Sequence, residues 1–221
     1  QTGIHAQRGV ACADCHMPTK KDGDVTFSDH RIASPLDGNI ANTCLTCHDQ
    51  TEKEFTDWLT IKLQRKDELM DLAMNGLAKA HLEAGKAWEA GATAEEMKDI
   101  LQDIRHGQWR WDYSIAGHGA YFHNPEETLR LLAQAGDKAQ QARVKLAAVL
   151  AKHGVIDYQV PDFSTKEKAQ ALAGINMEKE IAEKQAFKGA LLQEWNKEAV
   201  AKGRLNMESR KGMSGRSSYA K

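Results

Sequence analysis

The chain has 221 residues, of which 28% are charged and 41% are apolar, and its formal net charge is -1. This length suits one domain of ordinary size or a piece of a larger protein, and the even charge balance points to no nucleic-acid partner. The longest apolar stretch, around VKLAAVLA, is far shorter than the ~20 residues that a membrane-spanning helix requires. Because the chain starts at Gln1 without a leader, we expect a mature chain, a processed piece or a fragment.

A Cys-x-x-Cys-His motif occurs twice near the start of the chain and uses all four cysteines. The two copies are Cys12, Cys15 and His16, then Cys44, Cys47 and His48. In c-type haem attachment the two cysteines form thioethers with the porphyrin and the adjacent His becomes the proximal iron ligand. A zinc site built from both Cys pairs, or a thioredoxin-like redox pair, needs no trailing His. The motifs therefore favour two haem c groups, and haem c attachment predicts a periplasmic location.

The sixth iron ligand decides what such haems do, because an open position permits catalysis whereas a second His leaves electron transfer. The seven other histidines are His5, His30, His81, His106, His118, His123 and His153. His5 and His30 lie in the segment that would wrap the cofactors, so ligation and a surface role are both open. His123 lies beside a helix start, and His118, five residues earlier, is the alternative candidate for the same ligand position. The remaining three lie on helices or at their ends and are interpreted as packing or surface residues.

Residues 1–50 have turn-rich composition and no sustained periodicity, so we expect an irregular segment that is ordered by its haems. Residues 51–203 are predicted to form long helices, with little or no strand. Residues 204–221 are basic and rich in Gly and Ser, which is typical of a disordered tail and less often of a docking segment. The fold class is therefore all-α, a multihaem cytochrome c.

Helix boundaries in the long-helix region follow from capping signals. The first helix starts at Glu52, and Gly91 ends it. Its apolar face consists of Phe55, Leu59, Leu63, Met70, Ala73, Leu77, Ala80, Ala84 and Trp88. The three later starts are a capping box at Thr93 and Glu96, an Asn124-Pro125 start and a cap at Ser164 with Glu167. The third helix should end near Lys152, and the last should run unbroken to about Gly203. The apolar faces fit either a dimer seam or an ordinary helical core.

The stretch QWRWD on the second of these helices allows two interpretations. Trp109 and Trp111 could pack on a haem edge while Arg105 or Arg110 pairs with a propionate. The alternative, which we favour for the tryptophans, is a helix that buries two large aromatic side chains in its core.

Taken in order, GIHAQRGVACADCHMP, SDHRI, TCLTCH, DIRHGQWRWD, HNPEE and STKEKAQ resemble the C-terminal half of pentahaem cytochrome c nitrite reductase, the ammonia-forming enzyme. The resemblance runs from His5 to about Trp195. It implies that the first motif binds the fourth haem, with His123 as the far-side ligand. It also implies that the second motif binds the fifth haem with His5, and that His30 reaches a haem attached elsewhere.

This resemblance implies that both local irons are closed by two histidines, so that no catalytic residue lies in this chain. The family's six-electron reduction of nitrite to ammonium occurs at a haem held by a Cys-x-x-Cys-Lys motif, near calcium, and neither is expected in this chain. The family's long helices form a homodimer, and its electron donor is a membrane-anchored or soluble multihaem cytochrome. A stand-alone dihaem electron-transfer protein, or an enzyme of the hydroxylamine oxidoreductase or tetrathionate reductase type, stays open.

Overall fold

A computed structural model describes residues 3–31, 34–37 and 39–205. Its elements are α1 (Ile4–Gln7), α2 (Cys12–His16), β1 (Thr19–Asp22), β2 (Val25–Ser28), the 3-10 helices η1 (Ile40–Asn42) and η2 (Cys44–Thr46), α3 (Glu52–Glu89), α4 (Ala94–Ala116), α5 (Ala120–His123), α6 (Pro125–Lys152), α7 (Lys166–Leu172), α8 (Met177–Gly189) and α9 (Leu191–Ala201). The chain divides into two compact units, residues 1–160 and 161–221. The all-α prediction is confirmed, because the only sheet in the described residues is the β1–β2 hairpin.

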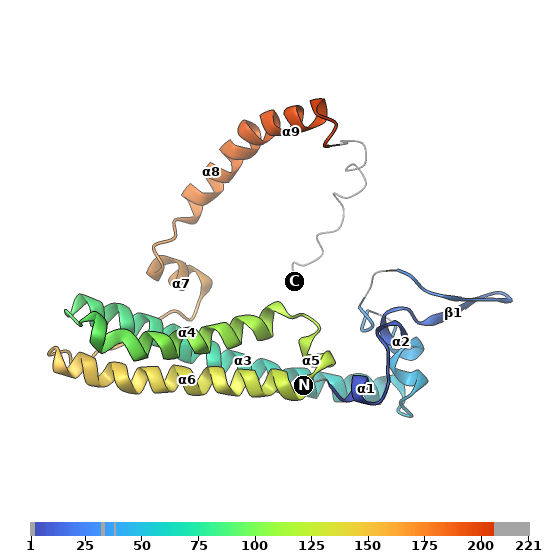
Figure 1. Cartoon of the computed structure of the whole chain (residues 1–221), viewed down its shortest axis with the longest axis horizontal. Coiled ribbons are helices and arrows are strands. Elements are labelled where there is room, and N and C mark those ends of the chain that lie inside the picture. The colour runs from blue at the N-terminus through green and yellow to red at the C-terminus, as the bar shows by residue number, and fades with distance from the viewer. Residues whose placement is uncertain (1–2, 32–33, 38, 206–221) are drawn as a thin grey trace. The chain divides into compact units, whose positions relative to one another are not determined.

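The first unit is built on three long helices, α3, α4 and α6, which lie side by side (Figure 1). The predicted capping box at α4 is present, since the Thr93 hydroxyl accepts from the Glu96 amide and the Glu96 carboxylate accepts from the Thr93 amide. Asn124 caps α6 with Pro125 at the first helical position, also as predicted. Gly91 has φ +93°, a left-handed conformation that suits glycine and ends α3.

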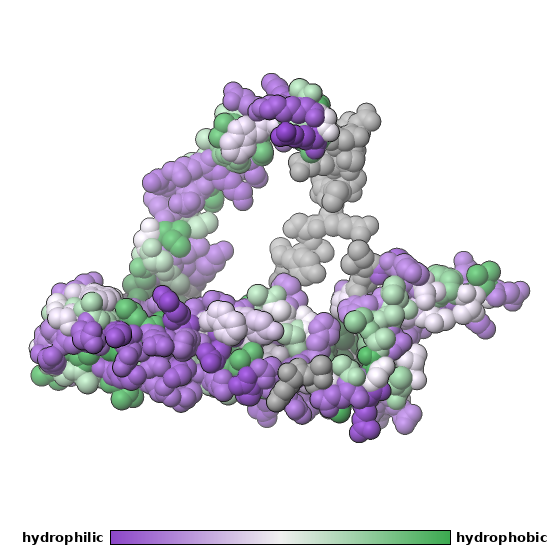
Figure 2. All heavy atoms as spheres, viewed as in Figure 1, coloured by the Kyte–Doolittle hydropathy of each residue, from purple (hydrophilic) through white to green (hydrophobic). Residues whose placement is uncertain are grey.

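Small side chains let these three helices approach closely. The buried core contains Ala80, Ala84, Ala87, Ala92, Met97, Ile100, Ile104, Ala142, Leu146 and Leu150. On α4, a Cβ atom added at Gly107 would lie 2.9 Å from the Leu77 side chain and 3.2 Å from the Ala135 carbonyl oxygen. The apolar faces of α3, α4 and α6 therefore form one core within this unit, and hydrophilic residues predominate on the side of the bundle seen in Figure 2.

Ion pairs join the long helices across the core. Arg143 on α6 donates in a bidentate manner to Glu83 on α3, at 2.8 to 3.0 Å. Asp103 on α4 is 6% exposed and accepts from Lys138 at 2.8 Å and from Lys145 at 2.5 Å, both on α6. Burial alone would raise the pKa of Asp103, but these hydrogen bonds lower it below its ordinary value.

The N-terminal segment attaches to one end of this bundle. A small apolar cluster of Ile40, Phe55 and Leu59 joins η1 to the start of α3, with Phe122 of α5 packed beside it. The segment also contains the β1–β2 hairpin, which the sequence analysis did not foresee. Its two-residue turn is Gly23-Asp24, with Gly23 at φ +59°, and a Gly-Asp pair between two short strands is a recognised hairpin signal. The segment is therefore more regular than predicted.

The prediction of one unbroken C-terminal helix from Ser164 to Gly203 is wrong. The second unit contains three helices, α7 to α9, and Thr165 rather than Ser164 supplies the first cap. Gly174 adopts φ +68° and ends α7, after which Asn176 caps α8 with its side-chain oxygen. A break at Ala190 separates α8 from α9. Of the predicted tail 204–221, residues 206–221 lie outside the described residues.

Two tryptophans that the sequence assigned to buried faces lie at the surface. The buried face of α3 contains Ala80, Ala84 and Ala87, at steps of four and then three residues. Trp88 lies one residue beyond this face and is 43% exposed. Trp109 is 60% exposed and stacks on Tyr113. Trp111 is partly buried and donates to the Met70 carbonyl at 3.0 Å, so one of the two predicted core tryptophans faces inward.

Candidate haem site

Each motif histidine faces a second histidine from another part of the chain. The ring centroids of His16 and His123 are 6.2 Å apart, with an interplanar angle of 63°. Those of His48 and His5 are 6.3 Å apart, with an angle of 78°. His16 and His123 come from α2 and α5, which are separated by more than one hundred residues, and the structure brings them together at the end of the bundle.

The spacing of both pairs matches what one metal ion between two imidazoles requires. Each metal–nitrogen bond is about 2 Å long, so two nitrogens on opposite sides of an ion lie about 4 Å apart, and the ring radii add about 1 Å on each side. The resulting centroid separation of about 6 Å agrees with both observed values. The residues present therefore fit two bis-histidine irons, although the ligation itself stays a prediction.

The cysteines of both motifs are available for attachment. All four are free thiols; Cys12 and Cys47 are exposed, and Cys15 and Cys44 are partly buried. Burial raises the pKa of the Cys15 thiol, and the nearby Cys44 raises it further. Because Cys15 and Cys44 interact electrostatically, the two motifs are neighbours in space. Two haems attached here would be adjacent groups.

Packing against the bundle fixes the positions of His48 and of α5. The buried Phe55 ring, at the start of α3, lies 5.0 Å from the His48 ring between centroids. On α5, the buried Tyr121 donates its hydroxyl proton to the Lys62 carbonyl at 3.0 Å. Burial raises the pKa of Tyr121, so the hydroxyl stays protonated and keeps this bond at neutral pH. His48 and His123, which lies on α5, are thus both positioned by contacts with the long helix α3.

His30 lies just after the hairpin, is exposed, and is hydrogen-bonded through Nδ1. Its Nδ1 is 2.8 Å from the Ser28 carbonyl oxygen, and because a carbonyl only accepts, Nδ1 must carry the proton. A metal-binding histidine typically donates from one ring nitrogen to such an acceptor and binds the metal through the other, which in His30 is Nε2. Both neighbours are fixed by an ion pair, since Arg31 donates to Asp29 at 2.7 to 3.1 Å.

The buried Asp29 also forms an ion pair with Lys20 of β1, at 2.7 Å. Hydrogen bonds from Arg31 and Lys20 hold the pKa of Asp29 well below its usual range. The side chain of Asp29 thus joins Lys20 of the hairpin to Arg31, the residue that follows His30. The sequence analysis did not single out Asp29, although its position in SDHRI, next to a candidate ligand, was the available signal.

The remaining histidines do not join either pair. His118, the rival of His123, is exposed, and no ring contact between it and a motif histidine occurs in the described part of the chain. His81 and His106 are exposed on α3 and α4. His153 ends α6 and lies 3.1 Å from Glu96, which links that helix end to the start of α4. These three positions agree with the packing or surface roles expected of them.

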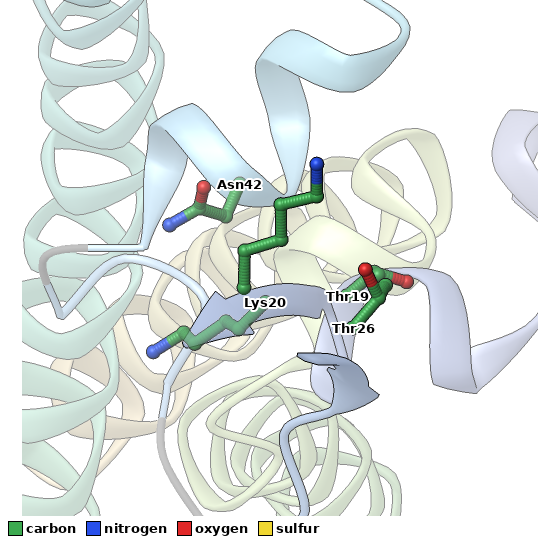
Figure 3. A pocket seen from close by; sticks show the side chains of 5 residues that line it. Thr19, Lys20, Thr26 and Asn42 are labelled. Carbon is green, nitrogen blue, oxygen red and sulfur yellow. The ribbon is translucent and has the colours of Figure 1, made fainter. Parts of the chain in front are cut away.

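An open hollow of about 650 Å³ lies between the hairpin and η1 (Figure 3). Its lining residues are Thr19, Lys20, Lys21, Thr26 and Asn42. The hydroxyl, amide and ammonium groups can all donate hydrogen bonds, and Asn42 precedes the Cys44 motif by two residues. The chemistry of this lining suits a carboxylate group.

A zinc site shared by the two Cys pairs is not supported by the arrangement of their side chains. Across residues 3–31, 34–37 and 39–205, no group of three or more His, Cys, Asp or Glu side chains is placed to hold a metal ion. A structural zinc site requires four converging ligands. The two-histidine arrangement described above is the one that the geometry favours.

Comparison with known proteins places the chain in a family. The family described as cytochrome c552 matches residues 1–206. The chain belongs to the cytochrome c552 family. A cytochrome c-552 from Desulfotalea psychrophila is 62% identical over 218 residues, which cover 99% of this chain and 43% of that protein. A cytochrome c-552 from Aliarcobacter butzleri is 52% identical over 219 residues, 99% of this chain and 44% of that protein. The chain thus spans less than half the length of these relatives.

Among solved structures, a cytochrome c nitrite reductase from Desulfovibrio desulfuricans superposes with a TM-score of 0.63 at 26% identity. The match covers 72% of this chain and 34% of that one. That protein is described as the catalytic subunit, NrfA, with two calcium sites. Membership of a cytochrome c family implies haem c, and the free thiols and paired histidines of this chain fit that group. No helix within the described ranges is long and apolar enough to span a bilayer.

Proposed function

We propose that this chain is the electron-transfer, C-terminal part of a pentahaem, ammonia-forming cytochrome c nitrite reductase. The observation that carries the proposal is the facing of each motif histidine by a second histidine at a separation that suits one iron. The family membership and the likeness to NrfA support it, and so does the match to less than half of each cytochrome c-552 relative.

In this proposal Cys12 and Cys15 attach the fourth haem, with His16 and His123 as its two axial ligands. Cys44 and Cys47 attach the fifth haem. Its axial ligands are His48 and His5. Each haem, when bound, supplies a one-electron iron couple. Because both axial positions are taken by histidine, these sites accept and pass electrons but leave no place for nitrite.

The reduction of nitrite to ammonium consumes six electrons and occurs, in this proposal, at a haem outside this chain. This chain then contributes no catalytic residue and is inactive toward nitrite when it is alone. His30 is proposed to ligate a further haem whose attachment motif lies elsewhere. Its exposed ring, with Nδ1 protonated toward the Ser28 carbonyl, supports this role.

Four further properties belong to the proposal and come from the family resemblance. Haem c attachment supports a periplasmic location. Calcium, which the NrfA structure is described as containing, is proposed to bind through residues outside this chain. The homodimer is proposed to form through the outer faces of the long helices, since their inner faces pack in the core of a single chain. The donor is proposed to be a membrane-anchored or soluble multihaem cytochrome.

The first test is the mass of the native, haem-retaining protein together with its haem-to-polypeptide ratio. A polypeptide about twice as long with five haems supports the proposal. A native chain of 24.5 kDa with two haems would replace it by a stand-alone dihaem relay. An upstream Cys-x-x-Cys-Lys motif in the longer chain would separate nitrite reductase from the hydroxylamine oxidoreductase and tetrathionate reductase types.

The second test addresses ligation within this chain, with His118 as the matched control for His123. His123→Ala should convert one of the two haems from low-spin to high-spin and allow the reduced iron to bind carbon monoxide. His118→Ala should leave both haems low-spin. Electronic absorption and electron paramagnetic resonance spectra read both results. A His123→Ala protein with two low-spin irons and no added ligand would contradict the assignment.

A further inference from the structure

Two glycine residues pack closely against His123, one against its ring and one against its backbone. The first is Gly119, which precedes α5. A Cβ atom added at Gly119 would lie 2.7 Å from Cε1 of the His123 ring, 3.2 Å from Nδ1 and 3.3 Å from Nε2. Gly119 has φ -92° and ψ -4°, a conformation that any residue can adopt. Glycine therefore leaves the space that the observed ring position needs, because the imidazole ring lies directly against the backbone.

The second contact is made by Gly3, which is buried and precedes α1. A Cβ atom added at Gly3 would lie 1.8 Å from the His123 carbonyl oxygen and 2.8 Å from its carbonyl carbon. Gly3 has φ -69° and ψ 167°, so its backbone conformation again does not demand glycine. The absence of a side chain lets the backbone at Gly3 pack directly on the backbone at His123.

The two contacts differ in which group would have to move if a Cβ atom were added at the glycine. At Gly119 the obstructed group is a side-chain ring, which can rotate about its χ angles while the fold is kept. At Gly3 the obstructed group is backbone, so the start of α1 and the end of α5 would have to move apart. His5 is two residues after Gly3, and the Gln7 amide donates to the Gly3 carbonyl at 3.1 Å. A displacement of Gly3 would therefore also displace the histidine that faces His48.

We propose that Gly119 and Gly3 are positioning residues for the paired histidines: Gly119 orients the His123 ring toward His16, and Gly3 sets the positions of His123 and His5 relative to each other. This inference rests on the proposed function, in which both histidines are axial ligands. It adds that the far-side ligands of two adjacent haems share one backbone contact. A change at that contact alters both haems.

The experiment uses the haem-loaded protein and three alanine variants. Gly119→Ala should turn the His123 ring, so that one of the two haems becomes high-spin and, when reduced, binds carbon monoxide. Gly3→Ala should affect both haems in the same assay. Gly85→Ala is the control, because an atom added there meets nothing within 4 Å, and both haems should stay low-spin. Added imidazole should restore the low-spin spectrum of Gly119→Ala, a rescue that a general loss of packing would not show.

Reference variants separate a failure of this inference from a failure of the proposed function. If His123→Ala itself leaves both irons low-spin, His123 is not a ligand and the proposed ligation fails. If His123→Ala opens one haem but Gly119→Ala keeps the wild-type spectrum and reduction potentials, the role of Gly119 is overturned. A Gly3→Ala protein in which only one haem changes would overturn the shared contact. If the Gly3→Ala protein does not load two haems, the spectrum of Gly119→Ala decides whether glycine positions the His123 ring. That substitution meets only the His123 ring and does not displace α1.

Discussion

Removing the charge of Asp103 should destabilise the helical bundle in a way that depends on pH. Its carboxylate lies between α4 and α6, is 6% exposed and accepts from Lys138 and Lys145. Breaking a buried ion pair by removing one partner costs about 3–5 kcal/mol. Both lysine side chains are partly exposed, which reduces the cost, so we expect about 1–3 kcal/mol for Asp103→Asn at pH 7.

The pH dependence follows from the lowered pKa of Asp103 in the folded state. A carboxylate whose pKa is lower when folded contributes its stability above the unfolded pKa, which is about 3.9 for Asp. That contribution is lost as the pH falls through the folded pKa. The difference in unfolding free energy between wild type and Asp103→Asn should therefore be full at pH 5 to 7, and it should shrink as the solution is acidified below about pH 4.

The assay is urea denaturation followed by far-ultraviolet circular dichroism, which reports on the helices rather than on the haems. Asp99→Asn on the same helix is the matched control, because Asp99 is exposed, and it should change the unfolding free energy by less than about 0.5 kcal/mol. Equal losses for the two variants at pH 7, or a loss for Asp103→Asn that does not change on acidification, would refute the role given to the ion pairs.

Three other substitutions test the packing of the bundle and its connection to the haem segment. Leu146→Ala should cost about 2–5 kcal/mol in thermal unfolding because Leu146 is fully buried, whereas Leu72→Ala, at a position 68% exposed, should cost much less. Gly107→Ala should lower the melting temperature despite the better helix propensity of alanine, because overpacking costs about 1–3 kcal/mol and the propensity gain is about 1 kcal/mol; a raised melting temperature would show that α4 can shift. Phe55→Ala should destabilise by about 3 kcal/mol and alter the haem spectrum, because its ring packs on His48; an unchanged spectrum would exclude that positioning role.

The sequence predicted the bundle well because its helix signals are local. Thr93 and Asn124 stand at the helix starts they predict, and Gly91 and Gly154 have the left-handed conformations that end helices. The breaks in the C-terminal unit were missed because apolar residues recur across them. Gly174 marked one of these breaks in the sequence.

Contacts between distant parts of the chain could not be read in the same way. Arg143 and Glu83 are separated by sixty residues, and no local pattern indicates that they meet. The same holds for Gly3 and Gly119, because a glycine that is required for space looks like any other glycine in a sequence. The histidine pairs were predicted only through a family resemblance. Among seven candidate histidines, their spacing alone did not rank His5 and His123 first.

The difference between the two halves of the first unit explains how its haems would be held in place. The three long helices enclose a core of their own, and Met97, Ile100 and Leu146 in it are at most 2% exposed. Among its described residues, the N-terminal segment buries few apolar side chains apart from Ile40, so it is held by its contacts with the bundle and, in the proposed function, by its haems. Those contacts are made at the proposed ligands, with Phe55 against His48 and Gly3 against His123. The bundle thus sets the positions of the histidines that are proposed as axial ligands, and in that proposal the positions of the irons follow from them.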